Sequence, residues 1–167
     1  NYAGNGNSID AKLSVSEDIS LNSTRGGSSM ELAGIITGSG TITLNSTTAA
    51  ETATGKVVIS GANAGFTGKV IVEQGATLTL QNTDSLSSAS VVLNTGGTLN
   101  LDAPGVVNLK ALPLQSGSIL AISSIVGTND ASSADAVLNI KDGSLELDNV
   151  VLNLNFSQEL KAMTTYN

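Results

Sequence analysis

The 167-residue chain contains no cysteine and no histidine. Without cysteine, neither a disulfide framework nor a thiolate metal site can form. Without histidine, the chain lacks the commonest general base and the commonest nitrogen ligand of transition metals. We therefore expect no metal, no cofactor and no Ser–His–Asp triad.

Positive charge is also scarce. Seven Lys and Arg residues stand against 14 Asp and Glu residues, a formal net charge of −7. Because phosphates and anionic lipid headgroups are bound by clustered cations, we expect neither nucleic acid nor an anionic membrane surface as a partner. No run reaches the roughly 18 apolar residues of a membrane-spanning helix, so we do not expect direct membrane insertion. The chain does not open with a signal peptide, and its composition favours a mature fragment of a longer protein over an intracellular protein.

Aromatic residues are limited to Tyr2, Phe66, Phe156 and Tyr166, and proline occurs twice. A compact globular core normally uses large rings to fill irregular space. Val, Ile, Leu and Ala supply almost all of the apolar residues here. Such a composition suits a narrow, regular interior in which stacked positions are alike.

The apolar residues alternate with polar ones in short runs, which is the signature of β-strands. Gly, Asn, Asp, Ser and Thr separate the runs, as expected of turns. A glycine introduces the apolar-x-apolar pattern five times, at Gly40, Gly75, Gly97, Gly117 and Gly143. The expected strands cover residues 13–15, 19–21, 30–32, 42–44, 57–59, 70–72, 78–80, 91–93, 99–101, 106–109, 119–122, 137–140, 145–147 and 150–154, and residues 157–163 form either a helical turn or a further strand.

The runs recur at a regular interval. The steps from Leu78 to Leu99 and from Leu99 to Ile119 are each about 20 residues, a period typical of solenoids. The step from Ile119 to Leu145 is longer, which predicts an inserted loop over residues 127–135. We therefore predict an all-β fold in which residues 1–167 form a single domain, a single-stranded parallel β-helix of about eight coils.

The stacked core of this β-helix should be aliphatic. We expect the ladders to contain Ile42, Val58, Val70, Leu78, Val92, Leu99, Ile119 and Leu145. A leucine-rich repeat lacks support, because its asparagine ladder and helical return are absent. An antiparallel sandwich is the more serious alternative, and it predicts tight hairpins between neighbouring strands.

Residues 61–80 resemble the autotransporter-associated β-strand repeat of bacterial autotransporter passenger domains. The repeat has an Asn/Gly turn, an aromatic residue, Thr-Gly, a Val-rich strand and then Gly-x-Leu-x-Leu. The matching residues here are Asn63, Phe66, Thr67, Gly68, Val70, Val72, Gly75, Leu78 and Leu80. The resemblance is good over residues 38–102, with one complete unit, and weaker elsewhere. It implies a right-handed β-helix, export across the outer membrane of a Gram-negative bacterium, and display at the cell surface or release from it.

Two acidic regions are candidates for chemistry. Asp142, Glu146 and Asp148 lie near Lys141, and Glu146 and Asp148 would share the outer face of a strand at a separation of about 6.6 Å. Such a pair fits a carbohydrate-acting β-helix enzyme, although a solvated strand face explains it more simply. The stretch 128–135 offers oxygen ligands for Ca²⁺, but it lacks the spacing of a known calcium loop.

The sequence thus favours a non-catalytic, extracellular stalk or adhesive segment, with no catalytic residue assigned. Polysaccharide lyase-like or glycoside hydrolase-like activity is the alternative. Expected partners are a second copy of the chain, or glycans or proteins of host and bacterial surfaces. Outward Thr, Asn and Ser ladders could zip against another molecule, and open β-helix ends could stack.

Overall fold

The computed structural model describes residues 7–23, 29–46, 55–125 and 138–156. Within these ranges all regular structure is β-strand, and no residue is helical. The strands are β1 (Asn7–Ile9), β2 (Leu13–Val15), β3 (Ile19–Ser23), β4 (Ser29–Leu32), β5 (Ile36–Gly38), β6 (Thr41–Ser46), β7 (Gly55–Ile59), β8 (Lys69–Val72), β9 (Ala76–Leu80), β10 (Leu86–Leu93), β11 (Thr98–Leu101), β12 (Val107–Ala111), β13 (Ile119–Ile125), β14 (Leu138–Ile140) and β15 (Val151–Phe156).

The strands form three sheets, and every described strand pair is parallel. The seven-stranded sheet has the order β1-β4-β7-β9-β11-β13-β15. A six-stranded sheet has the order β14-β12-β10-β8-β6-β3, and β2 pairs with β5 in a third. Each interior strand of the two large sheets therefore pairs with strands of the coils before and after it, which is the arrangement of a β-solenoid. The expected parallel solenoid is confirmed, and the antiparallel sandwich is wrong.

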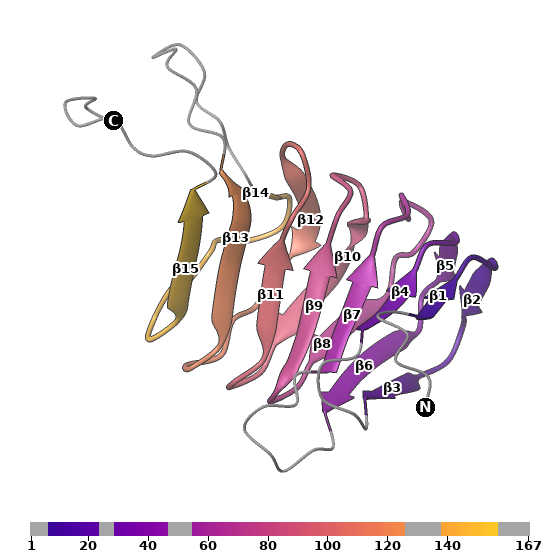
Figure 1. Cartoon of the computed structure of the whole chain (residues 1–167), viewed down its shortest axis with the longest axis horizontal. Helices are drawn as coiled ribbons and strands as arrows, with labels where there is room; N and C mark the ends of the chain where they lie inside the picture. The colour runs from indigo at the N-terminus through magenta and orange to yellow at the C-terminus, as the bar shows by residue number, and fades with distance from the viewer. Residues whose placement is uncertain (1–6, 24–28, 47–54, 126–137, 157–167) are drawn as a thin grey trace.

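The two large sheets lie face to face as two layers, with β1 at one end of the molecule and β15 at the other (Figure 1). Because the seven-stranded sheet is the largest, the expected count of eight coils is not confirmed. Several side-chain hydrogen bonds join residues 21 positions apart, which matches the expected repeat of about 20 residues.

Aliphatic ladders fill the space between the layers. In the seven-stranded sheet, Val57, Leu78, Leu99 and Leu120 are buried at successive strands of one ladder. Two positions on, a second ladder holds the buried Leu32, Ile59, Leu80, Leu101 and Ile122. The six-stranded sheet faces them with buried Ile42, Val70 and Val91, and with Leu44, Val72 and Leu93.

The expected core residues are confirmed in part. Ile42, Val70, Leu78 and Leu99 are buried members of these ladders. Val58 is buried but lies in the outward row, opposite Glu31 and Thr79. Val92 and Ile119 are half-buried neighbours of the inward Val91 and Leu120, and Leu145 is exposed.

The expected strand at residues 145–147 is wrong, because this segment is part of an irregular crossing between β14 and β15. Ile119 is paired instead with Val151, so the last coil is longer than the step to Leu145 suggested. Two short strands, β1 and β5, were not expected from the sequence. The expected loop 127–135 and the helical turn or strand at 157–163 lie outside the described residues.

A left-handed turn precedes four strands of the seven-stranded sheet. Gly75, Gly96, Gly117 and Asn149 have φ values of 75°, 74°, 79° and 54°. The amide of Gly75 donates to the carbonyl of Gly96, that of Gly96 to Gly117, and that of Gly117 to Asn149. Since only Gly, and less readily Asn, adopts this conformation at low cost, the repeated glycine follows from a turn that is stacked from coil to coil.

Candidate functional surface

The three carboxylates proposed for catalysis do not lie on a strand. Asp142, Glu146 and Asp148 belong to the exposed crossing over residues 141–149. Glu146 Oε1 accepts a hydrogen bond of 3.0 Å from Ser144 Oγ. Lys141 Nζ donates to the carbonyl of Ser87 at 2.8 Å. The expected pair of carboxylates on one strand face is therefore wrong.

The lysine contact has a local cause in the six-stranded sheet. The register between β10 and β12 shifts between Leu86 and Ser90, so this part of the ladder is irregular. The Ser87 carbonyl lies in that interval, where it accepts the hydrogen bond from Lys141 Nζ. Lys141 thus binds the backbone at a register shift between two strands, a role that the sequence did not suggest.

The candidate calcium stretch 128–135 lies outside the described residues. Among residues 7–23, 29–46, 55–125 and 138–156, no three acidic side chains come close enough to hold a metal ion.

The first four residues of the autotransporter resemblance, Asn63, Phe66, Thr67 and Gly68, form a corner between β7 and β8. Phe66 is fully buried, and a backbone bridge joins it to Gly38 of the coil before. Thr67 donates its amide hydrogen to the Gly38 carbonyl at 2.9 Å. Gly68 is required by close approach, since an added Cβ would lie 2.0 Å from the carbonyl oxygen of Gly40.

Asn63 completes this corner with its side chain. It is fully buried, and its Oδ1 accepts a hydrogen bond of 2.6 Å from the amide of Ile36. Its Nδ2 donates to the carbonyl of Gly61 at 3.0 Å. The Asn63 carboxamide thus accepts the hydrogen bond of the Ile36 amide on β5, which the backbone carbonyl of a neighbouring strand would otherwise accept. Asn63, Phe66, Thr67 and Gly68 thus all take part in the contacts that form this corner of the coil.

Polar side chains on the outside also join neighbouring coils. The amide of Asn45 donates to Asn22 at 3.1 Å, and that of Asn139 donates to Asn108 at 3.0 Å. Further hydrogen bonds of this kind run from Asn94 to Glu73 at 2.9 Å, from Gln81 to Asp102 at 3.1 Å, and from Ser123 to Asn100 at 2.6 Å. Many of the outward side chains that could bind another molecule therefore have partners within the chain.

Threonine pairs behave differently on the two sheets. Thr41 and Thr43 lie on β6, where their strand neighbours are Lys69 and Ile71, so no threonine ladder continues. Thr77 is followed by Thr98 on the next strand. Thr79 lies in the neighbouring outward row but is fully buried, and its Oγ1 has no hydrogen-bond partner among the described residues.

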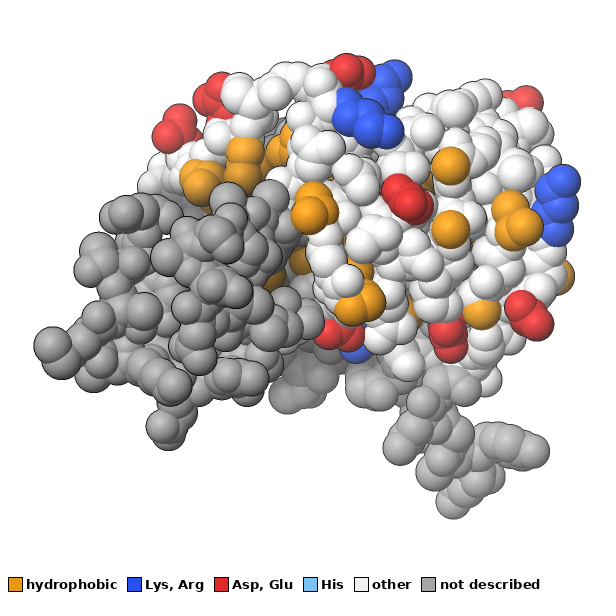
Figure 2. Space-filling model, turned by 90° about the horizontal axis from the view of Figure 1, so that it is seen from above, with side chains coloured by type: hydrophobic (Ala, Val, Ile, Leu, Met, Phe, Trp, Pro, Cys, Tyr) orange, Lys and Arg blue, Asp and Glu red, His pale blue; other side chains and the backbone are white. Residues whose placement is uncertain are grey.

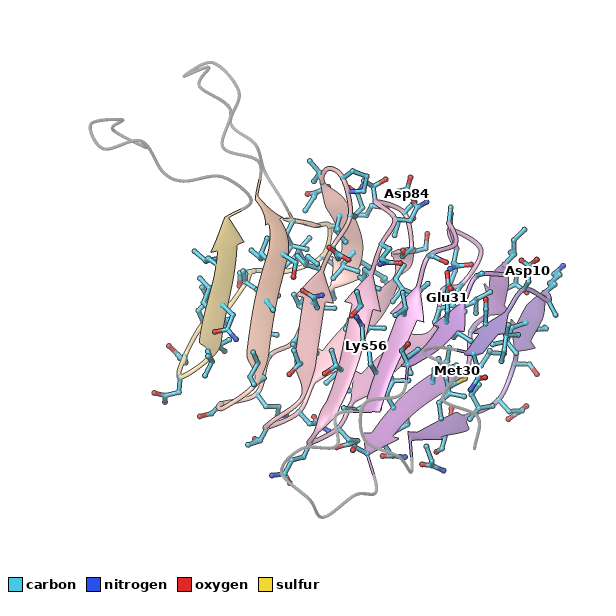
Figure 3. All side chains as sticks on the ribbon, in the orientation of Figure 1. Asp10, Met30, Glu31, Lys56 and Asp84 are labelled. Atoms are coloured by element: carbon cyan, nitrogen blue, oxygen red, sulfur yellow. The ribbon has the colours of Figure 1, made fainter. Side chains whose placement is uncertain are left out.

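The outer surface carries few charges. Seen from above, isolated acidic and basic side chains stand among uncharged ones (Figure 2). Figure 3 shows Glu31 and Lys56 on the neighbouring strands β4 and β7, with Asp10 and Asp84 at separate turns. Glu31 accepts a hydrogen bond of 2.6 Å from Ser60 Oγ. The face seen in this view thus carries few charged side chains.

Exposed apolar residues gather at one end of the molecule. Eight large hydrophobic side chains are exposed among the described residues, and five of them belong to the C-terminal coil: Leu145, Leu147, Val151, Leu152 and Leu154. Leu152 and Leu154 continue the two inward ladders beyond Leu120 and Ile122. Among the described residues, exposed large apolar side chains are therefore most numerous in this coil.

Comparison with protein-family models, with curated proteins and with solved structures found no match. Within the described residues, no helix has the length and apolar character needed to cross a membrane.

Proposed function

We propose that this chain is a non-catalytic segment of a bacterial autotransporter passenger, wound as a right-handed β-helix and exported across the outer membrane of a Gram-negative bacterium. It acts there as a stalk or an adhesive surface. The observation that carries the proposal is the stack of parallel coils closed around aliphatic ladders. The resemblance of residues 61–80 to the autotransporter repeat supplies the family.

The arrangement of the coils supports a mechanical role. Strands of neighbouring coils lie about 4.8 Å apart, so each added coil extends the rod by that distance. Large aliphatic side chains fill the interior at successive coils. Binding is therefore a property of the outer faces, the turns and the ends, which display hydroxyl and carboxamide groups. Such groups suit surface glycans, surface proteins or a second copy of the chain.

Export can be tested by placing the chain between a secretion signal and the translocating barrel of a well-studied autotransporter. We expect intact cells to display it as a protease-resistant core. In a matched Phe66→Asp variant, an unpaired charge replaces a buried ring, so the displayed chain should be protease-sensitive. Retention of the unchanged chain inside the outer membrane would contradict the proposed export.

The adhesive role needs a separate measurement. Cells that display the chain should settle faster, or bind glycan-coated or protein-coated surfaces more strongly, than cells that display the barrel alone. The purified chain should release no new reducing ends and no unsaturated sugars from a panel of polysaccharides. Cleavage by the chain that is lost in Glu146→Gln or Asp148→Asn would overturn the non-catalytic reading.

A further inference from the structure

Three lysines come together on one side of the six-stranded sheet. Of the seven Lys and Arg residues, Arg25 and Lys161 lie outside the described ranges, and Lys69, Lys110 and Lys141 are three of the five that remain. They are far apart in the sequence but lie on one sheet, on β8, on β12 and directly after β14. All three side chains are exposed.

The register of the strands makes these lysines neighbours. Lys69 lies opposite Ser90 on β10, and Ser90 lies opposite Ala111, the residue after Lys110. Two strand spacings of about 4.8 Å therefore separate Lys69 from the strand that carries Lys110. Lys141 follows the last residue pair of β12 and β14, which puts it directly beside Lys110.

The side chain of Lys141 extends toward the other two lysines. Its Nζ donates a hydrogen bond of 2.8 Å to the carbonyl of Ser87 on β10, so the side chain crosses β12, the strand that carries Lys110. This contact fixes one ammonium group at β10, between the strand of Lys69 and the strand of Lys110. Its remaining N–H groups can bind a ligand, since a lysine ammonium carries several donors.

No carboxylate of the described residues neutralises these lysines. None of the three forms an ion pair with a described acidic side chain. Asp142 adjoins Lys141 along the chain, but it is exposed and forms no such pair either. Like charges on directly opposite residues repel each other, so an anion bound beside Lys110 and Lys141 would relieve their repulsion. In a chain of net charge −7, the three lysines form a local region of opposite sign.

Uncharged polar groups adjoin the lysines. Ser88 and Ser90 on β10 are half-buried and lie close to the Ser87 carbonyl along the chain. Asn108 and Asn139 lie one strand position apart from the lysines of β12 and the last coil, and the Asn139 amide donates to Asn108 at 3.0 Å. Hydroxyl and carboxamide groups both donate and accept hydrogen bonds, so they can bind sugar hydroxyls next to an anionic group.

We propose that Lys69, Lys110 and Lys141 bind the carboxylate or sulfate groups of an acidic polysaccharide. Separate ammonium groups on neighbouring coils suit a polymer whose charges are spaced by uncharged sugars. A nucleic acid fits less well, because it carries one negative charge per about 1.7 Å and would bring most of its phosphates against uncharged or acidic surface. The inference deepens the proposed adhesive role and rests on it, since it names the ligand that the displayed surface binds.

Binding is measured with the purified full chain and defined polymers in solution. The probes are hyaluronate, which has a carboxylate on alternate sugars, a sparsely sulfated dextran, and uncharged dextran as the control. We expect the chain to bind at least one of the two acidic polymers, with an affinity that falls as salt screens the charges, and not to bind dextran. The acidic polymer that binds more tightly distinguishes a carboxylate ligand from a sulfate ligand. Failure of both to bind, or equal binding of dextran, would overturn the proposal.

Substitution locates the site. Lys69→Gln and Lys110→Gln keep long polar side chains, and each should weaken binding by about fivefold. Lys12→Gln and Lys56→Gln are the matched controls, because Lys12 lies between β1 and β2 and Lys56 lies on β7 of the other large sheet. Both controls should leave the affinity unchanged. Equal losses in all four variants would show that net charge alone governs binding and would overturn the assigned site.

Lysine acetylation of the unmodified chain gives a test that does not depend on the folding of a variant. The acidic polymer that binds should protect Lys69 and Lys110 from the reagent and leave Lys12 reactive, as mass spectrometry of the peptides measures. Protection of Lys12 without protection of Lys69 and Lys110 would overturn the assigned site. Binding of duplex DNA or poly-glutamate that is as tight as that of the acidic polysaccharides would overturn the choice of ligand.

The outcomes separate this site from the proposed function. If no acidic polymer binds the purified chain, the site is wrong, whereas export and a role as a stalk are unaffected. If the chain binds an acidic polysaccharide through Lys69 and Lys110, but cells that display it do not adhere to surfaces coated with that polymer, the site is supported and the adhesive role is contradicted.

Discussion

Replacement of Asn63 by alanine should destabilise one corner of the solenoid. The variant removes the acceptor of the Ile36 amide and the donor to the Gly61 carbonyl. Ile36 and Asn63 are both fully buried, so water cannot readily replace the lost partner. Leaving a buried amide unsatisfied costs about 1–3 kcal/mol, and loss of the second hydrogen bond adds about 1 kcal/mol. We therefore expect the free energy of unfolding to fall by about 2–4 kcal/mol.

Denaturant unfolding followed by circular dichroism measures this loss. The matched control is Asn94→Ala, which removes a half-buried hydrogen bond to Glu73 that joins two coils from the outside. Because solvent can satisfy Glu73, the control should lose about 0.5–1 kcal/mol. Hydrogen exchange supplies the local readout: the Ile36 amide should lose protection in Asn63→Ala, while the Leu101 amide keeps it. An Ile36 amide that remains protected, or equal losses in the two variants, would refute the assigned role of Asn63.

Three further substitutions probe other features of the coil. Thr79→Val replaces a buried hydroxyl that lacks a described partner by a methyl group, so the midpoint of unfolding should rise by the equivalent of about 1 kcal/mol; a fall would mean that the hydroxyl is satisfied. Gly117→Ala places a Cβ on a residue in the left-handed conformation and should lower the free energy of unfolding by about 1–2 kcal/mol. Gly65 has no positive φ, so Gly65→Ala should lower it less, and equal losses in the two variants would argue against the stacked turn. Lys141→Met keeps the apolar part of the side chain but removes the hydrogen bond to the Ser87 carbonyl. In thermal or denaturant unfolding, the free energy of unfolding should fall by about 1–3 kcal/mol, and an unchanged value would show that the contact does not stabilise the protein.

The architecture could be predicted from the sequence because every coil obeys the same local rules. Alternation of apolar and polar residues located most of the strands, and the period indicated parallel stacking. The steps near 20 residues correspond to real neighbours, as in the pairing of Leu78 with Leu99. Glycines before the strands were also informative, since Gly75 and Gly117 adopt the left-handed turn.

The alternation of apolar and polar residues did not identify the core-facing residue where two adjacent residues are both apolar. Val91-Val92 and Ile119-Leu120 each offer two candidates for the core, and propensity alone cannot choose between them. The choice is made by register: Leu120 stands beside Leu99, so Ile119 is turned outward. A shift of one residue exchanges the faces of a strand, and only the neighbouring coil determines which shift occurs.

The strand expected at residues 145–147 in the last coil was wrong for a related reason. Leu145 and Leu147 have the pattern of a strand, and Gly143 precedes them as other glycines precede real strands. Gly143 also has a positive φ, of 100°, but the left-handed turn that stacks on Gly117 is at Asn149, and the strand begins at Val151. The Gly117 amide donates to the Asn149 carbonyl, so the stacked turn selects the strand that follows Asn149 over the one that follows Gly143.

The turns and corners therefore determine the register, and the ladders stabilise it. Aliphatic residues at inward positions are interchangeable from coil to coil, as Val57, Leu78 and Leu99 illustrate, so they cannot specify which strands become neighbours. The hydrogen bond from the Ile36 amide to Asn63 forms in one register of the neighbouring strands only. The carbonyl of Gly40 leaves no room for a side chain at position 68.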